Sequence, residues 1–195
     1  MPTAPLPTHA PMTQFPVCDG ELIVGGLPLT QLAARIGQTP FYAYDRQLIA
    51  QRIAQLRSAL PASIKIHYAI KANPMPALVC RMAGLVDGLD VASGGELQVA
   101  LDIGAGAQRI SFAGPGKSRA ELAQAVAAGI LINIESFREV AELGAIRQAT
   151  GWPVRVAVRV NPDFELKGSG MKMGGGPKQF CVDAEQVPEL LAEIG

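Results

Sequence analysis

A lysine that follows an apolar β-type run is the side chain of this sequence best suited to covalent chemistry. Strand alternation over residues 64–70 puts His67 and Lys71 on one face, with Lys71 at the carboxyl end of the strand. A lysine amine held among apolar residues can attack a carbonyl carbon. An ordinary surface lysine also fits this position. Position alone therefore leaves both interpretations open.

Alternating strands and helices are expected to position this lysine. Apolar runs predict strands over residues 41–44, 64–70, 88–91, 109–112, 130–133 and 154–160. Apolar residues at three-to-four spacing predict helices over residues 46–60, 77–83, 95–103, 118–128, 136–150 and 184–194. From residue 64 onward the strands recur at roughly 21 to 25 residues, close to the minimum for one strand, one helix and two short loops. This regularity predicts a parallel sheet.

The alternation of strands and helices does not fix the sheet topology, because parallel strands linked by helices form either a barrel or an open sheet. Helix starts are indicated by Ser118 with Glu121 and by Ser136 with Glu139, two pairs that match the capping-box pattern. About five of the eight strand–helix units of a closed barrel can be identified. We therefore expect an α/β fold with a parallel sheet. If this sheet belongs to a (β/α)8 barrel, the chain supplies only a partial barrel and is cut short.

Three segments of different character divide the chain. Residues 1–19 predict a disordered tail, because residues 1–16 contain five prolines, no Lys or Arg and no apolar run, which also excludes a secretory signal. Residues 20–40 predict a short β segment, a Gly-Gly turn and a helix. Residues 41–195 contain the alternating strands and helices and are assigned to the N-terminal part of the (β/α) barrel. Within it, residues 161–178 lack either period and predict a long loop at the end of a strand, where barrels build their sites.

The amino-acid composition limits the classes of molecule that this protein is expected to bind. Seventeen basic and seventeen acidic residues give a formal net charge of zero, which provides no electrostatic footprint for nucleic acid or a membrane surface. A small-molecule partner is the default. Three cysteines without close spacing indicate neither a disulfide framework nor a zinc site, and no metal site is predicted. No apolar stretch reaches the length of a membrane span, so a cytoplasmic protein is expected.

Two motifs carry a resemblance to a known family. Residues 68–74, Tyr-Ala-Ile-Lys-Ala-Asn-Pro, and residues 89–96, Leu-Asp-Val-Ala-Ser-Gly-Gly-Glu, resemble segments of the ornithine/diaminopimelate/arginine decarboxylases. That family folds as an alanine-racemase-like barrel and uses pyridoxal 5′-phosphate. The resemblance implies that Lys71 holds the cofactor as a Schiff base and that Asp90 and Glu96 belong to the hydrogen-bonding shell around it. If the family resemblance is set aside, Asp90 is interpreted as the end of a strand and Glu96 as an acidic residue that favours a helix start.

Later segments extend the resemblance. Residues 110–118 end in Gly-Lys-Ser but fail as a nucleotide-binding loop, because Ser111 occupies the position of a required glycine. They resemble the family's third strand and loop, so Lys117 either lines the mouth of the site or is solvated. Arg159, in a segment ending Arg-Val-Asn-Pro, is expected to point toward the cofactor or to pair with a neighbouring carboxylate.

Residues 171–180 resemble the exosortase A system-associated branch of the family, and Cys181 replaces an expected glycine, which could strain the loop. The family's ring-stacking histidine, phosphate loops and catalytic cysteine have no match, so the resemblance covers only the first half of a typical member. It implies an enzyme that decarboxylates an amino-acid substrate. The complete enzyme is expected to be a homodimer.

Three alternatives remain. They are a racemase-like enzyme on the same barrel, a non-catalytic cofactor-binding protein, and a truncated chain that folds only against a partner. The substrate amino acid is not fixed by this sequence. His67, deeper in its strand than Lys71, is interpreted as a buried hydrogen-bonded histidine rather than a catalyst.

Overall fold

The computed structural model describes residues 13–162 and 180–194 of the chain. It divides the chain into two compact units, Met1–Ala62 and Ser63–Gly195, and each is described here by itself. Most of the predicted tail, residues 1–19, falls outside the described residues. Near its end, the first β-strand begins at Val17. The division at residues 20 and 41 stays a prediction.

The first unit is a small antiparallel sheet with two helices. Its sheet has the order β1-β2-β3 and is built from β1 (Val17–Cys18), β2 (Glu21–Val24) and β3 (Leu27–Pro28). The turn between β2 and β3 has positive φ at Gly25 and Gly26, a conformation that glycine adopts without a Cβ clash. The helices are α1 (Leu29–Ile36) and α2 (Arg46–Ala59). The predicted β segment, turn and helices are confirmed.

One predicted strand of this unit is wrong. Residues 41–44 belong to none of the sheets formed by the described residues, and Tyr42 is 88% exposed. A four-residue apolar run satisfies the strand pattern, but a strand also needs a neighbour to accept its backbone hydrogen bonds. No described strand lies beside this run.

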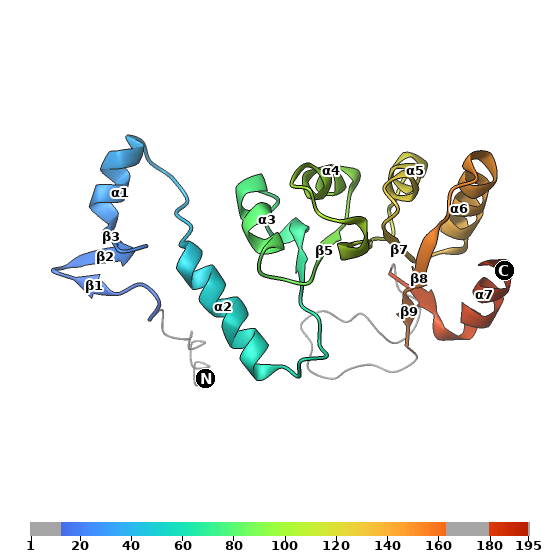
Figure 1. Ribbon diagram of the computed structural model, residues 1–195, viewed down its shortest axis with the longest axis horizontal. Helices are drawn as coiled ribbons and strands as arrows, with labels where there is room; N and C mark the ends of the chain where they lie inside the picture. The colour runs from blue at the N-terminus through green and yellow to red at the C-terminus, as the bar shows by residue number, and fades with distance from the viewer. Residues whose placement is uncertain (1–12, 163–179, 195) are drawn as a thin grey trace, which may run out of the picture. The chain divides into compact units, whose positions relative to one another are not determined.

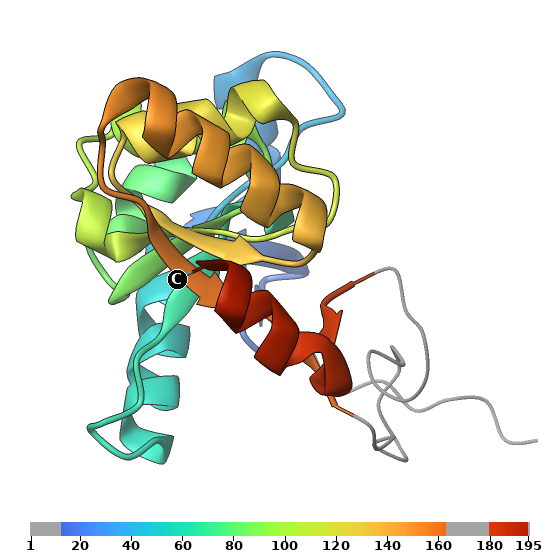
Figure 2. The same ribbon diagram turned by 90° about the vertical axis from the view of Figure 1, so that its right-hand side faces the viewer.

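The second unit is a parallel sheet covered by helices. Its five strands lie in sequence order, β4-β5-β6-β7-β8, and every neighbouring pair is parallel. The strands are β4 (His67–Ala69), β5 (Gly88–Val91), β6 (Ile110–Phe112), β7 (Leu131–Ile134) and β8 (Arg155–Val158). The connecting helices are α3 (Pro76–Ala83), α4 (Gly94–Asp102), α5 (Arg119–Ala127) and α6 (Phe137–Thr150). Figures 1 and 2 show these helices on one side of the sheet. The predicted partial barrel is confirmed.

Short elements complete this unit. The 3-10 turns η1 (Ile70–Ala72) and η2 (Ala107–Arg109) flank strands, and β9 (Val160–Asn161) pairs in parallel with β10 (Val182–Asp183). η3 (Ala184–Gln186) and α7 (Val187–Ile194) end the described chain. The predicted strand over residues 154–160 is interrupted at Arg159, which lies between β8 and β9. The predicted loop 161–178 falls almost wholly outside the described residues.

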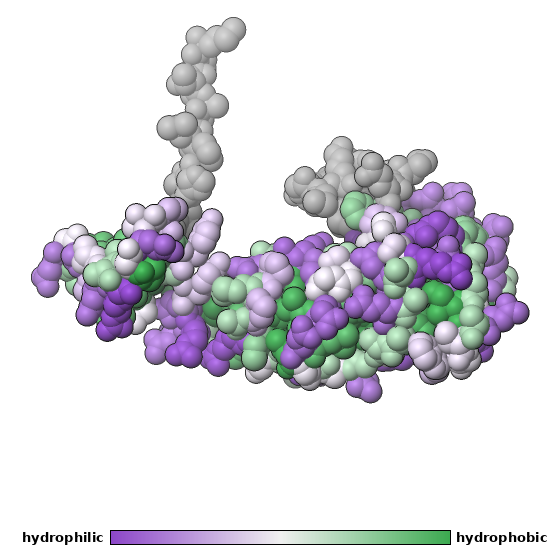
Figure 3. Space-filling view, turned by 90° about the horizontal axis from the view of Figure 1, so that it is seen from above, coloured by the Kyte–Doolittle hydropathy of each residue, from purple (hydrophilic) through white to green (hydrophobic). Residues whose placement is uncertain are grey.

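Alternation along the strands separates an apolar face from a polar one. The face under the helices is fully buried and contains Leu89, Val91, Ile110, Phe112, Ile132 and Ile134. The residues between them, Asp90, Ser111 and Asn133, therefore lie on the opposite face. On the face seen in Figure 3, hydrophilic residues are interspersed with hydrophobic ones, as expected for helices with one side in solvent. Among the described helices, none is long and apolar enough to cross a bilayer.

We expect two adjacent leucines of α7 to respond differently to truncation. Leu190 is fully buried, whereas Leu191 is 53% exposed. Leu190→Ala should lower the free energy of unfolding by about 2–5 kcal/mol, because it leaves a cavity in the core beside α7. Leu191→Ala should change it by about 0.5 kcal/mol or less. Urea denaturation of the full chain measures both. Equal effects would mean that α7 does not dock through Leu190.

Candidate active site

A cavity of about 740 Å³ lies where the parallel strands end. Its lining comes from the carboxyl ends of the strands and from the residues that follow them. Named in chain order, the polar and charged lining residues are Lys71, Asp90, Ser111, Glu121, Asn133 and Arg159. Small-molecule sites have volumes of about 300–1,000 Å³, and barrel enzymes place theirs at this edge. The cavity is therefore the candidate active site.

Lys71 reaches the cavity from a well-defined turn. It occupies the middle of η1, immediately after β4, and its neighbour Ile70 is fully buried. The Asn73 N–H donates to the Ile70 carbonyl at 3.0 Å, and the Tyr68 hydroxyl donates to the Asn73 carbonyl at 3.0 Å. The Asn73 side chain accepts from the Met75 N–H at 3.1 Å. These bonds fix the backbone from which the lysine side chain extends.

The structure brings three of the four predicted cofactor-binding residues together. Lys71, Asp90 and Arg159 all line the cavity. Glu96 is not among the lining residues. Its carboxylate accepts from the Ala92 N–H at 2.9 Å, so it stabilises the start of α4 beside the cavity. The roles of these four residues stay predictions.

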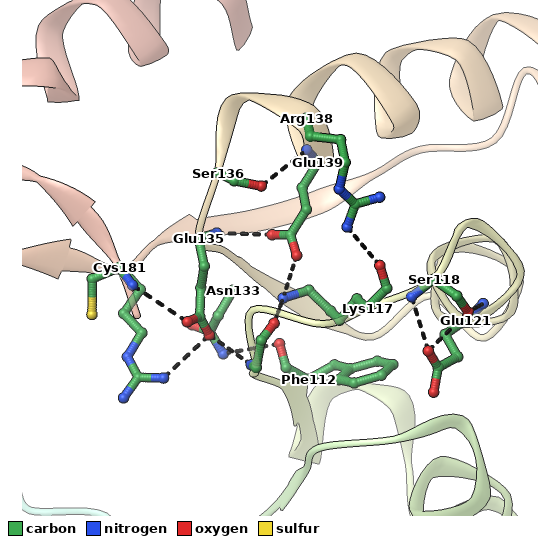
Figure 4. Close-up of polar contacts among 12 residues, drawn as sticks. Phe112, Lys117, Ser118, Glu121, Asn133, Glu135, Ser136, Arg138, Glu139 and Cys181 are labelled. Atoms are coloured by element: carbon green, nitrogen blue, oxygen red, sulfur yellow. Dashed lines mark hydrogen bonds and ion pairs between the residues drawn. The ribbon is translucent and has the colours of Figure 1, made fainter. Parts of the chain in front are cut away.

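A buried ion pair fixes the loop between β6 and α5. Lys117 Nζ lies 3.0 Å from Glu139 Oε1, and the two side chains are 1% and 0% exposed. The ammonium also donates to the Gly114 carbonyl and lies 5.9 Å from the centre of the Phe112 ring. Figure 4 shows Lys117 pointing toward Glu139. Among the described residues none forms a well-aligned hydrogen bond with Glu139 Oε1, so its contact with Lys117 is an ion pair held by charge.

Lys117 thus occupies neither of the two positions expected for it from the sequence. It does not line the cavity mouth and it is not solvated. The sequence pattern could not reveal this, because the partner that makes burial of the amine possible lies 22 positions later, on α6.

A second buried carboxylate, Glu135, joins three segments at the cavity. Its Oε1 accepts from the Gly114 N–H at 2.6 Å and lies 3.1 Å from Arg159 Nη1. Its Oε2 accepts from the Cys181 N–H at 3.4 Å. The guanidinium of Arg159 also lies 5.4 Å from the centre of the Phe180 ring. Arg159 therefore pairs with a neighbouring carboxylate, one of the two expected arrangements, and also lines the cavity, while its contact with a cofactor stays a prediction.

The first predicted capping box is confirmed and has a further partner. Ser118 Oγ accepts from the Glu121 N–H, and the Glu121 carboxylate accepts from the Ser118 N–H at 2.9 Å. Glu121 also accepts from the Gly94 N–H at 2.8 Å. The backbone donors at Ser118 and Gly94 hold the pKa of Glu121 below its usual value, because they stabilise the ionised form. The carboxylate thereby ties the start of α4 to that of α5.

The second predicted capping box is only half formed. Ser136 Oγ accepts from the Glu139 N–H at 3.4 Å. The Glu139 carboxylate accepts from the Glu135 N–H at 2.8 Å, one residue before the cap, and pairs with Lys117. A buried cation is thus a stronger partner for this carboxylate than the backbone donor that the motif predicts.

Cys181 has a left-handed backbone conformation, with φ of 75°. This conformation crowds the Cβ of an L-residue and suits glycine, the residue that the family resemblance predicts here. Burial raises the pKa of the Cys181 thiol, and the Arg159 charge only partly opposes this shift. The strain expected from the sequence is therefore visible in the backbone.

The fold and cavity together define a class of protein. A sequence-ordered parallel strand–helix sheet, with a lysine at the carboxyl end of its first strand, is the architecture of the early units of a barrel enzyme. Within the described residues no group of three or more potential metal-ligating side chains occurs. The available chemistry is that of an amine, carboxylates and a guanidinium around one cavity.

Comparison with known proteins identifies the family. Residues 46–194 match the family described as pyridoxal-dependent decarboxylase, pyridoxal binding domain, and the chain belongs to it. It is 43% identical over 150 residues to diaminopimelate decarboxylase of Aquifex aeolicus, covering 76% of this chain and 35% of the relative. It is 39% identical over 169 residues to L-glutamyl-[BtrI acyl-carrier protein] decarboxylase of Niallia circulans, covering 85% and 39%.

Solved structures agree. The crystal structure of diaminopimelate decarboxylase from Helicobacter pylori complexed with L-lysine superimposes with a TM-score of 0.75 at 32% identity, covering 84% of this chain and 42% of that one. The chain thus spans about two fifths of the length of the proteins it matches. The predicted family of pyridoxal-phosphate decarboxylases and its cofactor class are confirmed. The exosortase-associated branch is not shown.

Sequence reasoning missed Glu135 and Glu139 as site residues. Glu139 was assigned to a cap and Glu135 to no role. A usable signal existed for Glu135, an acidic residue that follows directly on the partly buried strand β7, where an unpaired charge is costly, whereas Glu139 lies in the first turn of α6. His67 was expected to be buried and hydrogen-bonded. It is hydrogen-bonded to Asp90, but its side chain is 39% exposed.

Removing the buried ammonium should be costly. Lys117→Met leaves Glu139 as an unpaired buried carboxylate, so the free energy of unfolding should fall by about 3–5 kcal/mol. Adding Glu139→Gln should restore part of the loss, because the amide oxygen can still accept from the Glu135 N–H. The control is the pair Arg119–Glu142, 3.2 Å apart, whose Arg119 side chain is 65% exposed, so Arg119→Met should cost about 1 kcal/mol or less. Similar losses in both single variants, by denaturant titration, would contradict the assignment.

Replacing Cys181 should stabilise the protein. Cys181→Gly relieves a positive φ and should raise the free energy of unfolding by about 1 kcal/mol. Cys181→Ala removes the thiol and keeps the Cβ, so it should give no such gain. Cys80→Gly, inside α3, should lower stability by about 1 kcal/mol. Thermal unfolding of the three variants separates backbone strain from loss of a thiol, and a gain in the alanine variant would assign the effect to the thiol.

Proposed function

We propose that this chain provides the cofactor-binding part of a pyridoxal-phosphate-dependent amino-acid decarboxylase, with the cofactor held as a Schiff base on Lys71. The observation that carries the proposal is the position of Lys71, on a fixed turn at the carboxyl end of β4 and at the edge of the large cavity. The proposed covalent step is attack of Nζ on the cofactor aldehyde, with formation of a C=N bond and release of water.

The residues around the cavity fit such a cofactor. Its volume of about 740 Å³ accommodates a small molecule with a substrate beside it. Arg159 supplies a positive charge for an anionic group, and Glu135 holds the guanidinium in place at 3.1 Å. When bound, the cofactor supplies an electron sink for the carbanion formed on loss of carbon dioxide. The chain's own residues bind and orient it, and Asp90 and Glu96 remain proposed members of its hydrogen-bonding shell.

The substrate class follows from the relatives rather than from the described residues. Two of them are named for decarboxylation of diaminopimelate and of a glutamyl group on a carrier protein, and a solved relative contains L-lysine. We propose an α-amino acid as substrate. A link to an exosortase system rests on residues 171–180, of which only Phe180 is described. A homodimeric state is likewise a proposal from the family resemblance. A cytoplasmic location is a proposal from the sequence composition alone.

The Lys71 assignment predicts a covalent adduct with one lysine. After incubation with pyridoxal phosphate and reduction with borohydride, the unaltered chain should carry one pyridoxyl-phosphate group at Lys71, found by peptide mass mapping. Lys71→Ala should lose the adduct and the visible absorbance of lysine-bound cofactor. Lys65→Ala, an exposed lysine six residues earlier, should retain both.

Three outcomes decide between the proposed function and its alternatives. An adduct of equal yield in the Lys71→Ala variant would overturn the assignment of Lys71. An adduct at Lys71 without release of carbon dioxide from diaminopimelate, lysine, ornithine or arginine would support the alternative of a non-catalytic fragment. A racemase-like activity would be detected as exchange of the substrate's α-hydrogen with solvent without loss of carbon dioxide.

A further inference from the structure

A hydrogen-bonded group on the polar face of the sheet sits directly beside the cavity. His67 Nδ1 lies 3.0 Å from Asp90 Oδ1, and the Ser111 hydroxyl donates to the same oxygen. The three residues come from three adjacent strands, β4, β5 and β6. Asp90 and Ser111 are direct partners in the sheet register, whereas His67 reaches Asp90 across the diagonal.

Two small residues make the diagonal contact possible. The residue opposite His67 in the register is Gly88, and the residue opposite Asp90 is Ala69. A Cβ added at Gly88 would lie 2.5 Å from Cε1, 2.6 Å from Nε2 and 2.8 Å from Nδ1 of His67. The imidazole therefore occupies the space that any other side chain at position 88 would need. This glycine is required for a close approach, since its φ is not in the left-handed region.

The bonding pattern leaves one oxygen of Asp90 for another partner. Both donors bind Oδ1, and no described residue hydrogen-bonds to Oδ2. The Asp90 side chain is 42% exposed and lines the cavity, whereas Ser111 is 9% exposed. An ionised carboxylate only accepts hydrogen bonds, so Nδ1 of His67 carries the proton that faces it. One oxygen is thus fixed by the sheet and the other remains available at the cavity.

We propose that His67 and Ser111 are positioning residues that hold the Asp90 carboxylate in a single orientation, with Oδ2 presented to the cofactor or substrate. This inference rests on the proposed function for the identity of that partner. His67 does not reach the reacting atoms itself, because it is absent from the cavity lining and acts only through Asp90. Gly88 contributes by having no side chain, which leaves room for the His67 ring.

The first test determines which ring nitrogen of His67 carries the proton, in the full chain without cofactor. The sequence contains two histidines, His9 and His67, so ring ¹⁵N spectra are simple to assign. In its neutral form His67 should carry its proton on Nδ1. Gly88→Ala should displace the ring and shift the proton toward Nε2, while Gly84→Ala, whose added Cβ meets only an ordinary contact at 3.6 Å, should change nothing. A proton on Nε2 in the unaltered chain would refute the contact.

The second test connects the contact to the cavity and does not depend on Gly88→Ala being folded. His67→Leu should weaken binding of pyridoxal phosphate, measured by titration of its visible absorbance, by roughly tenfold, the effect of losing a hydrogen bond to a charged group. His67→Gln keeps a donor and should recover much of the affinity. Ser111→Ala should weaken binding while leaving the His67 proton on Nδ1, because Asp90 still accepts from the imidazole.

The outcomes separate this inference from the proposed function. If the unaltered chain binds no pyridoxal phosphate, the proposed function fails, and with it the link from Asp90 to a cofactor. The ¹⁵N spectra would still decide whether His67 orients Asp90. If the chain binds the cofactor and His67→Leu binds it equally well, the positioning role is wrong although the proposed function stands.

Discussion

Two carboxylates with no exposure to water determine how the loops meet at the cavity. Glu135 and Glu139 follow β7 closely, and each needs a cation because an unpaired buried charge costs several kcal/mol. Glu139 takes Lys117 from the loop after β6, and Glu135 takes Arg159 from the end of β8. The β6, β7 and β8 ends are thereby fixed to one another by charge, beyond what backbone pairing requires (Figure 4).

This arrangement gives the cavity a rigid wall where loops alone would be mobile. Glu135 also accepts from the Gly114 N–H, and Lys117 donates to the Gly114 carbonyl, so both backbone groups of one lining glycine are held. A site organised before its ligand arrives loses less conformational entropy on binding. The replacement of a buried ion pair by apolar residues often costs little stability, so such pairs are better explained by geometry than by stability.

The fold could be predicted from the sequence because its signals are local. Apolar runs and helical spacing indicated every strand of the parallel sheet, and Ser118 with Glu121 correctly marked the start of α5. The error at residues 41–44 arose because a short apolar run does not reveal whether a neighbouring strand exists. The break at Arg159 was missed for a similar reason, since its backbone bonds reach Ile134 and Val182.

The site was predictable only where a residue's role depends on its own strand. Lys71, Asp90 and Arg159 each lie at or close to the carboxyl end of a strand. Parallel strands bring these ends together, so their meeting at one cavity follows from topology. Lys117 depends instead on Glu139 of α6, a partner that no sequence spacing specifies. Glu96 accepts from the Ala92 N–H four residues earlier, as expected of an acidic residue at a helix start. Burial of a charged side chain is decided by its partner, and the partner is known only once the chain has folded.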